Sequence, residues 1–150
     1  TGTTAFASMG LTTQISSSVL VGNNKYRRPI TRNGVRISFL QQGNEITPIN
    51  IPLLRILDAL RLIKEIPACS PDECLTNIRK TIDALSMDLK RDLADLSLAY
   101  TPYVRALLGA IYESMGLETE NISKSLNGVT SYKLPISDNA LPNKRNWNIT

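Results

Sequence analysis

The stretch SPDECLTNIRKTIDALSMDLKRDLADLSLAY, residues 70–100, decides the fold class of this chain. Its apolar residues recur at alternating steps of three and four, the pattern of a helix with one buried stripe. They are Leu75, Ile78, Ile82, Leu85 and Leu89. A capping box at Ser70 and Glu73, with Pro71 in the first turn, marks the start of the helix. We expect one helix from here to Tyr100, roughly 29 residues and about 43 Å long.

Similar stripes flank this stretch. A helix that begins after an N-cap at Asn50 carries Leu53, Ile56, Leu57, Leu60 and Ile63 on one face. Another helix begins at Thr101 and ends at Gly116, and a short fourth one covers Glu120–Leu126. Because the connections are two to four residues long, neighbouring helices should pack antiparallel. Residues 50–128 therefore predict a helix bundle.

The first part of the chain, residues 1–49, reads as an extended arm with a small β-meander. Asn33 and Gly34 predict a two-residue hairpin turn, since both central positions of a type I′ turn need positive φ. A second turn is expected at residues 42–44. The three strands of the meander would cover Tyr26–Thr31, Val35–Leu40 and the residues around Ile46.

The last part, residues 129–150, contains Pro135, Pro142 and several asparagines, which favour an extended tail. The predicted fold class is therefore mainly α. It is a bundle of three to four antiparallel helices, with an N-terminal basic β-hairpin or extended arm and an extended C-terminal tail. The whole chain forms one domain with arms.

Charge is distributed unevenly along the chain. The first 44 residues contain no acidic side chain, whereas residues 45–128 carry twelve acids against nine bases. Residues 129–150 are basic again, with three bases and one acid. A basic arm on an acidic helical body suggests contact with a polyanion or with the acidic surface of a neighbour.

Five cations within twelve positions form what we call the basic cluster. They are Lys25, Arg27, Arg28, Arg32 and Arg36. Such a cluster suits contact with nucleic-acid phosphates, and arginine favours bidentate recognition. Tyr26 offers a single stacking platform. Two alternatives remain open: ion pairs with an acidic protein partner, and a hairpin face that is simply solvated.

No catalytic signature is present. The chain has no histidine, which removes the commonest general base and metal ligand. Thr1 resembles an N-terminal nucleophile, but hydrolases of that kind need large layered sheets. The acids Asp83, Asp88, Asp92 and Asp95 alternate with lysine and arginine, so we expect a solvated helix face and no metal site. We predict no enzymatic activity and no cofactor.

Cys69 and Cys74 are too few for a disulfide framework or a four-cysteine zinc site. We expect two free thiols, one of them in the core, although an oxidising compartment would allow the pair to form a disulfide. The sequons at Asn121 and Asn148 matter only in a secreted protein. No apolar run approaches the roughly 18 residues of a membrane span, so we expect no membrane partner.

The segment PYVRALLGA, Pro102–Ala110, resembles a stretch of the tobamovirus coat proteins, which read Pro-x-Val-x-Ala-Leu-Leu-Gly-Ala there. That resemblance implies a small helix bundle that stacks around genomic RNA in a rod or filament. The family has basic residues near the RNA directly after this stretch, whereas this chain has Ile111–Met115. No binding residue is therefore transferred.

These observations predict a self-assembling structural protein, a viral coat or nucleocapsid subunit. It would pack through its arms and bind RNA phosphates non-specifically through the basic cluster. Its partners would be copies of itself and RNA, with no small-molecule substrate, in the virion or the host cytoplasm. The alternative is a helical protein–protein interaction or scaffold module that does not bind nucleic acid.

Overall fold

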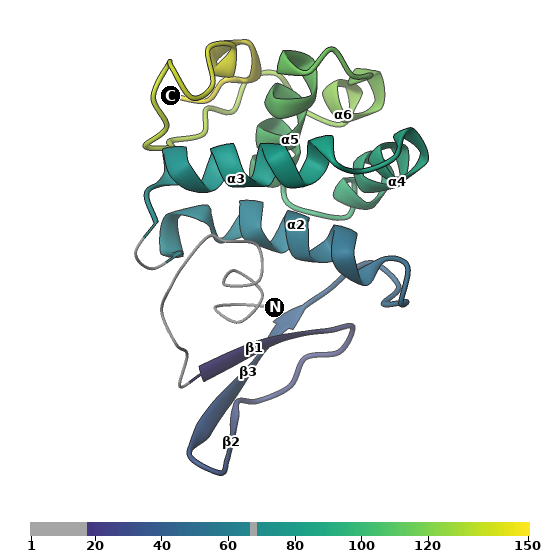
Figure 1. The fold of residues 1–150 in the computed structure, drawn as a ribbon, viewed down its shortest axis with the longest axis vertical. Helices are drawn as coiled ribbons and strands as arrows, with labels where there is room; N and C mark the ends of the chain where they lie inside the picture. The colour runs from purple at the N-terminus through teal and green to yellow at the C-terminus, as the bar shows by residue number, and fades with distance from the viewer. Residues whose placement is uncertain (1–17, 67–68) are drawn as a thin grey trace.

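The computed structural model describes residues 18–66 and 69–150; Thr1 and the rest of residues 1–17 lie outside them. The described chain is mainly helical with one small sheet, and this much of the predicted fold class is confirmed (Figure 1). Its helices are α2 (Ile51–Arg61), α3 (Pro71–Asp83), α4 (Met87–Ser97), α5 (Pro102–Ser114) and α6 (Glu120–Lys124), with 3₁₀ turns η1 (Ile63–Glu65) and η2 (Lys144–Trp147).

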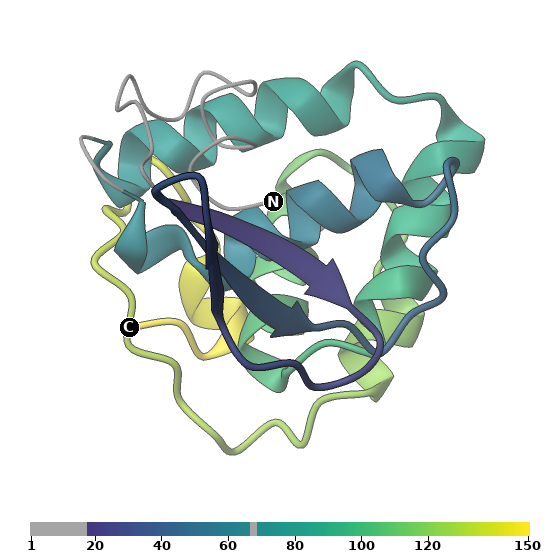
Figure 2. The same ribbon diagram turned by 90° about the horizontal axis from the view of Figure 1, so that it is seen from below.

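Helix α2 is the central element, because it packs against α3, α4 and α5. Its five predicted stripe residues are all buried, from Leu53 at the start to Ile63 just beyond the end. Helices α2 and α3 lie side by side and run in opposite directions (Figures 1 and 2). Leucine, isoleucine and valine supply most of the core, as the scarcity of aromatic residues requires.

The prediction of one long helix over residues 70–100 is wrong. The capping box of Ser70 and Glu73 does begin α3, but that helix ends at Asp83 and α4 begins at Met87. Ser86 has extended backbone and its hydroxyl accepts the amide N–H of Leu89 at 3.2 Å. A new N-cap at Ser86 therefore replaces continuous helix, because serine satisfies free amides at a helix start.

The sheet has the order β1-β3-β2 and lies on the far side of α2 from α3 (Figure 1). Its strands are β1 (Ser18–Asn23), β2 (Ile30–Arg32) and β3 (Val35–Gln41). Strand β2 pairs antiparallel with β3 through a turn in which Asn33 has φ 50° and Gly34 φ 75°, as the Asn-Gly pair predicts.

The expected third strand near Ile46 is wrong, and the sheet is not a meander. The third strand is β1, which precedes the hairpin and runs parallel to β3. Residue Asn44 forms a bend, residues 45–47 are irregular, and residues 48–50 form a turn. Pro48 explains this, because it lacks the amide that a ladder needs.

Hydrogen bonds tie the residues that follow β3 to the helical body. The Nε2 of Gln42 donates to the Tyr100 hydroxyl at 2.7 Å, and that hydroxyl donates to Oδ1 of Asp58 on α2 at 2.7 Å. The Nδ2 of Asn44 donates to the carbonyl oxygen of Leu96 at 2.9 Å. Burial raises the pKa of Asp58, partly offset by the Tyr100 hydrogen bond, and burial likewise raises the pKa of Tyr100. We call Gln42, Tyr100 and Asp58 the polar latch.

The C-terminal segment, residues 129–150, is irregular apart from η2, but it is folded back onto the helices. Its ends meet, because Tyr132 forms a bridge with Ile149. Five of its side chains are buried: Leu134, Ile136, Leu141, Trp147 and Ile149. A Cβ at Gly109 of α5 would lie 2.4 Å from Cζ3 of Trp147, so the indole ring fills the space that this glycine leaves open.

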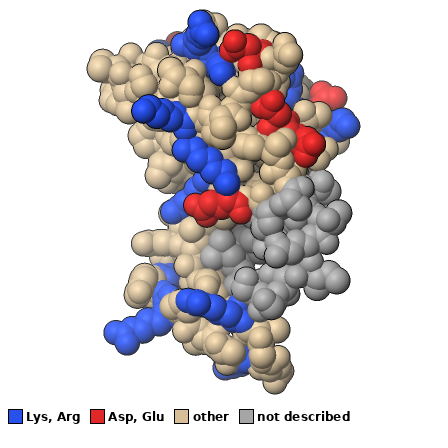
Figure 3. Space-filling view, turned by 90° about the vertical axis from the view of Figure 1, so that its left-hand side faces the viewer, with Lys and Arg blue, Asp and Glu red and all other residues tan. Residues whose placement is uncertain are grey.

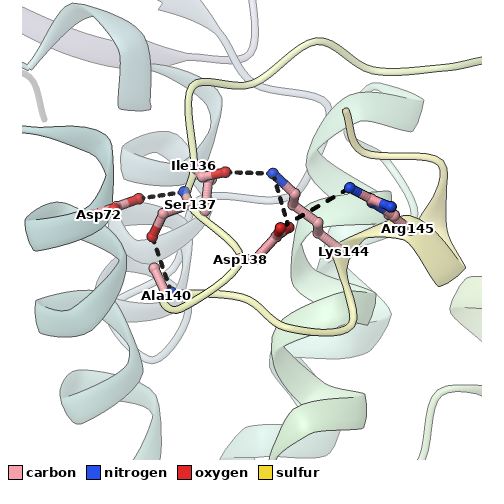
Figure 4. Close-up of polar contacts among 7 residues, drawn as sticks. All are labelled: Asp72, Ile136, Ser137, Asp138, Ala140, Lys144 and Arg145. Atoms are coloured by element: carbon pink, nitrogen blue, oxygen red, sulfur yellow. Dashed lines mark hydrogen bonds and ion pairs between the residues drawn. The ribbon is translucent and has the colours of Figure 1, made fainter.

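Polar contacts add to this docking (Figure 4). Oδ1 of Asp72 on α3 accepts the amide N–H of Ser137 at 2.9 Å, and this contact holds the pKa of Asp72 below its ordinary value. Nζ of Lys144 donates to the carbonyl oxygen of Ile136 at 2.6 Å and lies 3.4 Å from Oδ1 of Asp138. The segment predicted as an extended tail is thus part of the folded body.

Candidate nucleic-acid interface

The basic cluster lies entirely on the sheet and its loops. Lys25, Arg27 and Arg28 belong to the β1–β2 loop, Arg32 ends β2, and Arg36 lies in β3. All five side chains belong to exposed residues. In the described part of the chain, no carboxylate lies within ion-pair distance of any of them.

The strand register divides the cluster between the two faces of the sheet. Arg32 pairs with Val35 and Arg36 pairs with Thr31, at adjacent positions of the β2–β3 ladder. Because side chains alternate along a strand, Arg32 and Arg36 point to opposite faces. Strand β2 is an edge of the sheet. The cluster therefore presents Arg32 at this edge on one face of the sheet and Arg36 of the central strand on the other face.

Arg27 has a partner within the sheet. Its guanidinium carbon lies 6.0 Å from the centre of the Phe39 ring on β3, at the outer limit of a cation–π contact. Sequence reasoning missed this pair, because the two residues are twelve positions apart and meet only through the folding of the β1–β2 loop. The contact positions one member of the cluster without neutralising its charge.

Ion pairs do form elsewhere in the described chain, all on helices or in the C-terminal segment. They join Arg91 to Asp88, Lys124 to Glu120, and both Lys144 and Arg145 to Asp138. On the face shown in Figure 3, the lower part formed by the sheet displays basic side chains and no acidic ones. Described residues 18–44 in fact contain no acid at all. The sheet therefore carries uncompensated positive charge.

The other sequence candidates occupy ordinary structural positions. Asp83, Asp88, Asp92 and Asp95 are all exposed, as expected of a solvated helix face. Within the described ranges, no group of three or more cysteines and acids is arranged to hold a metal ion. None of the described helices has the length and apolar content needed to cross a membrane.

Both cysteines are free thiols and Cys74 is buried in the core, which confirms that prediction. Burial, together with the neighbouring Cys69, raises the pKa of the Cys74 thiol to about 12. Because the thiolate is the reactive form, Cys74 is a poor nucleophile at neutral pH. Cys69 is half-buried.

A cavity of about 340 Å³ between α4, α5 and α6 was not predicted from the sequence. Its lining is mixed, with Ala94, Tyr112 and Ile122 beside Lys90 and Asp95. No spacing in the sequence signals it, because its walls come from three helices. The hydroxyl of Tyr112 donates to the carbonyl oxygen of Lys90 at 2.7 Å, so this side chain serves the packing of α4 on α5.

Comparisons of the chain with models of protein families, with curated protein sequences and with solved structures gave no match. The stretch Pro102–Ala110, which resembles tobamovirus coat proteins, coincides with most of α5. Its apolar residues Val104, Leu107 and Leu108 are buried, and Gly109 receives Trp147. Packing of the core accounts for these residue types, and the basic cluster on the sheet remains the main candidate site.

Proposed function

We propose that this protein is a self-assembling structural protein, a viral coat or nucleocapsid subunit, whose basic cluster binds RNA phosphates without sequence specificity. The helices would act as an antiparallel bundle that forms the body of the subunit. The sheet would act as the basic arm, in a virion or in the host cytoplasm. Copies of this chain and RNA would be its partners.

The observation that carries the proposal is the set of five exposed cations with no described ion-pair partner. Cations that meet phosphates release counterions, so affinity falls steeply as salt rises. Five contacts to single-stranded RNA would give a slope of about −3.5 in log K against log salt concentration. A tenfold rise in salt should therefore weaken binding by roughly 3,000-fold.

Exposed apolar side chains support the self-assembly part of the proposal. Most of the described large apolar residues with high exposure lie between positions 21 and 49. They are Val21, Tyr26, Ile30, Ile46 and Ile49. Large apolar side chains left in solvent are candidates for contact with another protein molecule when they form part of a larger patch. The same part of the chain would thus contact both RNA and a neighbouring subunit.

The proposal predicts a specific loss of RNA affinity in the double variant Arg28→Gln/Arg32→Gln. Removing two of five phosphate contacts should reduce the salt slope by about 1.4 and weaken binding at low salt. Fluorescence anisotropy with a labelled RNA oligomer, over a series of salt concentrations, measures both effects. The matched control is Arg91→Gln/Lys124→Gln, which removes the same charge from exposed positions on α4 and α6.

Equal losses in the two double variants would show that only net charge matters, and would contradict the assignment of the site to the sheet. Light scattering at about 50 and 500 mM salt, with the 260/280 nm absorbance ratio, tests assembly in the same preparations. Large particles that carry nucleic acid and dissociate at high salt are expected. A monomer or dimer with no RNA affinity would favour the scaffold alternative.

A further inference from the structure

Tyr26 is the one aromatic residue of the described chain that is exposed. The residue is 79% accessible to solvent. The other described aromatic residues are buried or half-buried: Phe39, Tyr100, Tyr103, Tyr112, Tyr132 and Trp147. In a chain with so few aromatic residues, a ring left in water has no role in the core.

This ring lies inside the basic cluster. Lys25 precedes Tyr26 in the β1–β2 loop, and Arg27 and Arg28 follow it. The neighbouring guanidinium of Arg27 is directed to Phe39. In the described part of the chain, the cation–π pairs involve Phe39 and Tyr103 and leave the face of Tyr26 without a cation. The Tyr26 ring therefore remains open for a planar ligand group.

Phosphate contacts and an aromatic face are the two components of single-strand nucleic-acid sites. A groove or edge of cations follows the backbone, while bases stack on aromatic rings regardless of their sequence. A duplex offers the same phosphates but keeps its bases stacked on one another. An exposed tyrosine that lies between cations in the β1–β2 loop therefore favours a single strand over a duplex.

We infer that Tyr26 is a base-stacking residue and that the ligand of the basic cluster is single-stranded nucleic acid. This inference rests on the proposed function and specifies its ligand. The phosphates contact Arg28 and Arg32 along the β2 edge, and one unstacked base covers the Tyr26 ring. Since the site has a single ring, it selects strandedness and not sequence.

Three probes separate stacking from charge. They are a labelled single-stranded oligouridylate of about 15 nucleotides, an RNA duplex of the same length, and inorganic polyphosphate as a competitor that has charge but no bases. The wild-type chain should bind the single strand more tightly than the duplex, and polyphosphate should compete. Tyr26→Ala should weaken single-strand binding by about 5- to 100-fold. Polyphosphate should still compete with the labelled strand for Tyr26→Ala. Measured at matched occupancy, its inhibition constant should equal that for the wild type.

Tyr26→Phe is the conservative control, because it keeps the ring and should retain wild-type affinity for the single strand. Tyr26 is exposed, so neither variant should alter the melting temperature of the fold. Unchanged oligouridylate affinity in Tyr26→Ala, or an equal loss toward polyphosphate, would overturn the inference while phosphate binding stands. If the wild type bound none of the three probes, the proposed function would be refuted, and the inference with it.

Discussion

The sheet region and the C-terminal segment were both predicted to be basic, extended appendages, yet they differ in how much of each is buried. Residues 129–150 bury five large side chains against the helices. Described residues 18–44 place their central strand at intermediate exposure and leave Val21, Tyr26 and Ile30 exposed. Both regions carry net positive charge, so charge alone does not determine which of them docks.

The difference lies in what each region offers to the helical body. Trp147 of the C-terminal segment fills the space above Gly109. The backbone amide of Ser137 in the same segment donates to Asp72 of α3. Polar contacts of Gln42 and Asn44, which directly follow β3, tie the sheet to the helical body at one end. Burial of apolar groups stabilises more than exchange of hydrogen bonds with water. The segment is therefore part of the core, whereas the sheet is presented to solvent.

The largest effect expected from this comparison is that of Trp147→Ala. Removing a buried indole ring leaves a cavity over α5, and should lower the free energy of unfolding by about 3–5 kcal/mol. Urea denaturation followed by circular dichroism measures it. Val129→Ala, at a residue that is 84% exposed in the same segment, should change stability by less than about 0.5 kcal/mol. Comparable losses in both variants would mean that the segment is not docked as described.

Local signals in the sequence predicted local structure well. The capping box at Ser70 begins a helix, the stripe of α2 is buried, and Asn33-Gly34 forms the hairpin turn. Each of these features depends on residues only a few positions apart. The helix break at Ser86 is also local, but a continuing apolar stripe concealed it, because Leu85 and Leu89 fit either one helix or two.

Features that depend on distant residues were not predictable. Strand β1 pairs in parallel with β3 only because the chain crosses from one edge of the sheet to the other, and no sequence pattern encodes that register. The polar latch joins Gln42, Asp58 and Tyr100, which have no shared motif. For the candidate site, the sequence named the five cations, but not their distribution over both faces of the sheet.

A smaller effect is expected at the other attachment, from Tyr100→Phe. Loss of the hydroxyl leaves the Nε2 of Gln42 and the carboxyl group of Asp58 buried without this partner, which should cost about 1–3 kcal/mol. Relative to the wild type, hydrogen exchange in this variant should accelerate more at the β3 amides than at those of α5. Tyr26→Phe removes a hydroxyl from an exposed ring and should leave stability unchanged. Uniform acceleration across both elements would show that the latch does not act on the sheet in particular.

The smallest expected effect is the response to acid. The Asp72 and Asp58 contributions to stability should change with pH in opposite directions. Ser137 lowers the pKa of Asp72, so this contact stabilises the fold above the ordinary carboxyl value of 3.8 and is lost as pH falls through the lowered pKa. Burial raises the pKa of Asp58 above 3.8. Its protonated form is therefore favoured in the fold, and the associated stability is present at low pH and lost as pH rises through the raised pKa.

Acid should thus weaken the Asp72 contact of the C-terminal segment, whereas at Asp58 it relieves the cost of burying a charged carboxylate. Trp147 is the only tryptophan and reports on the segment by its fluorescence. Asp72→Asn should flatten the pH dependence of the free energy of unfolding that this fluorescence follows. The change should be less than about 1 kcal/mol, because the carboxylate is partly solvated. In the wild type, Asp58 lowers the free energy of unfolding as pH rises from acid toward neutral. Asp58→Asn should remove this contribution. If both variants changed the pH profile in the same direction, the opposite pKa shifts assigned to Asp72 and Asp58 would be contradicted, and with them this difference between the two regions.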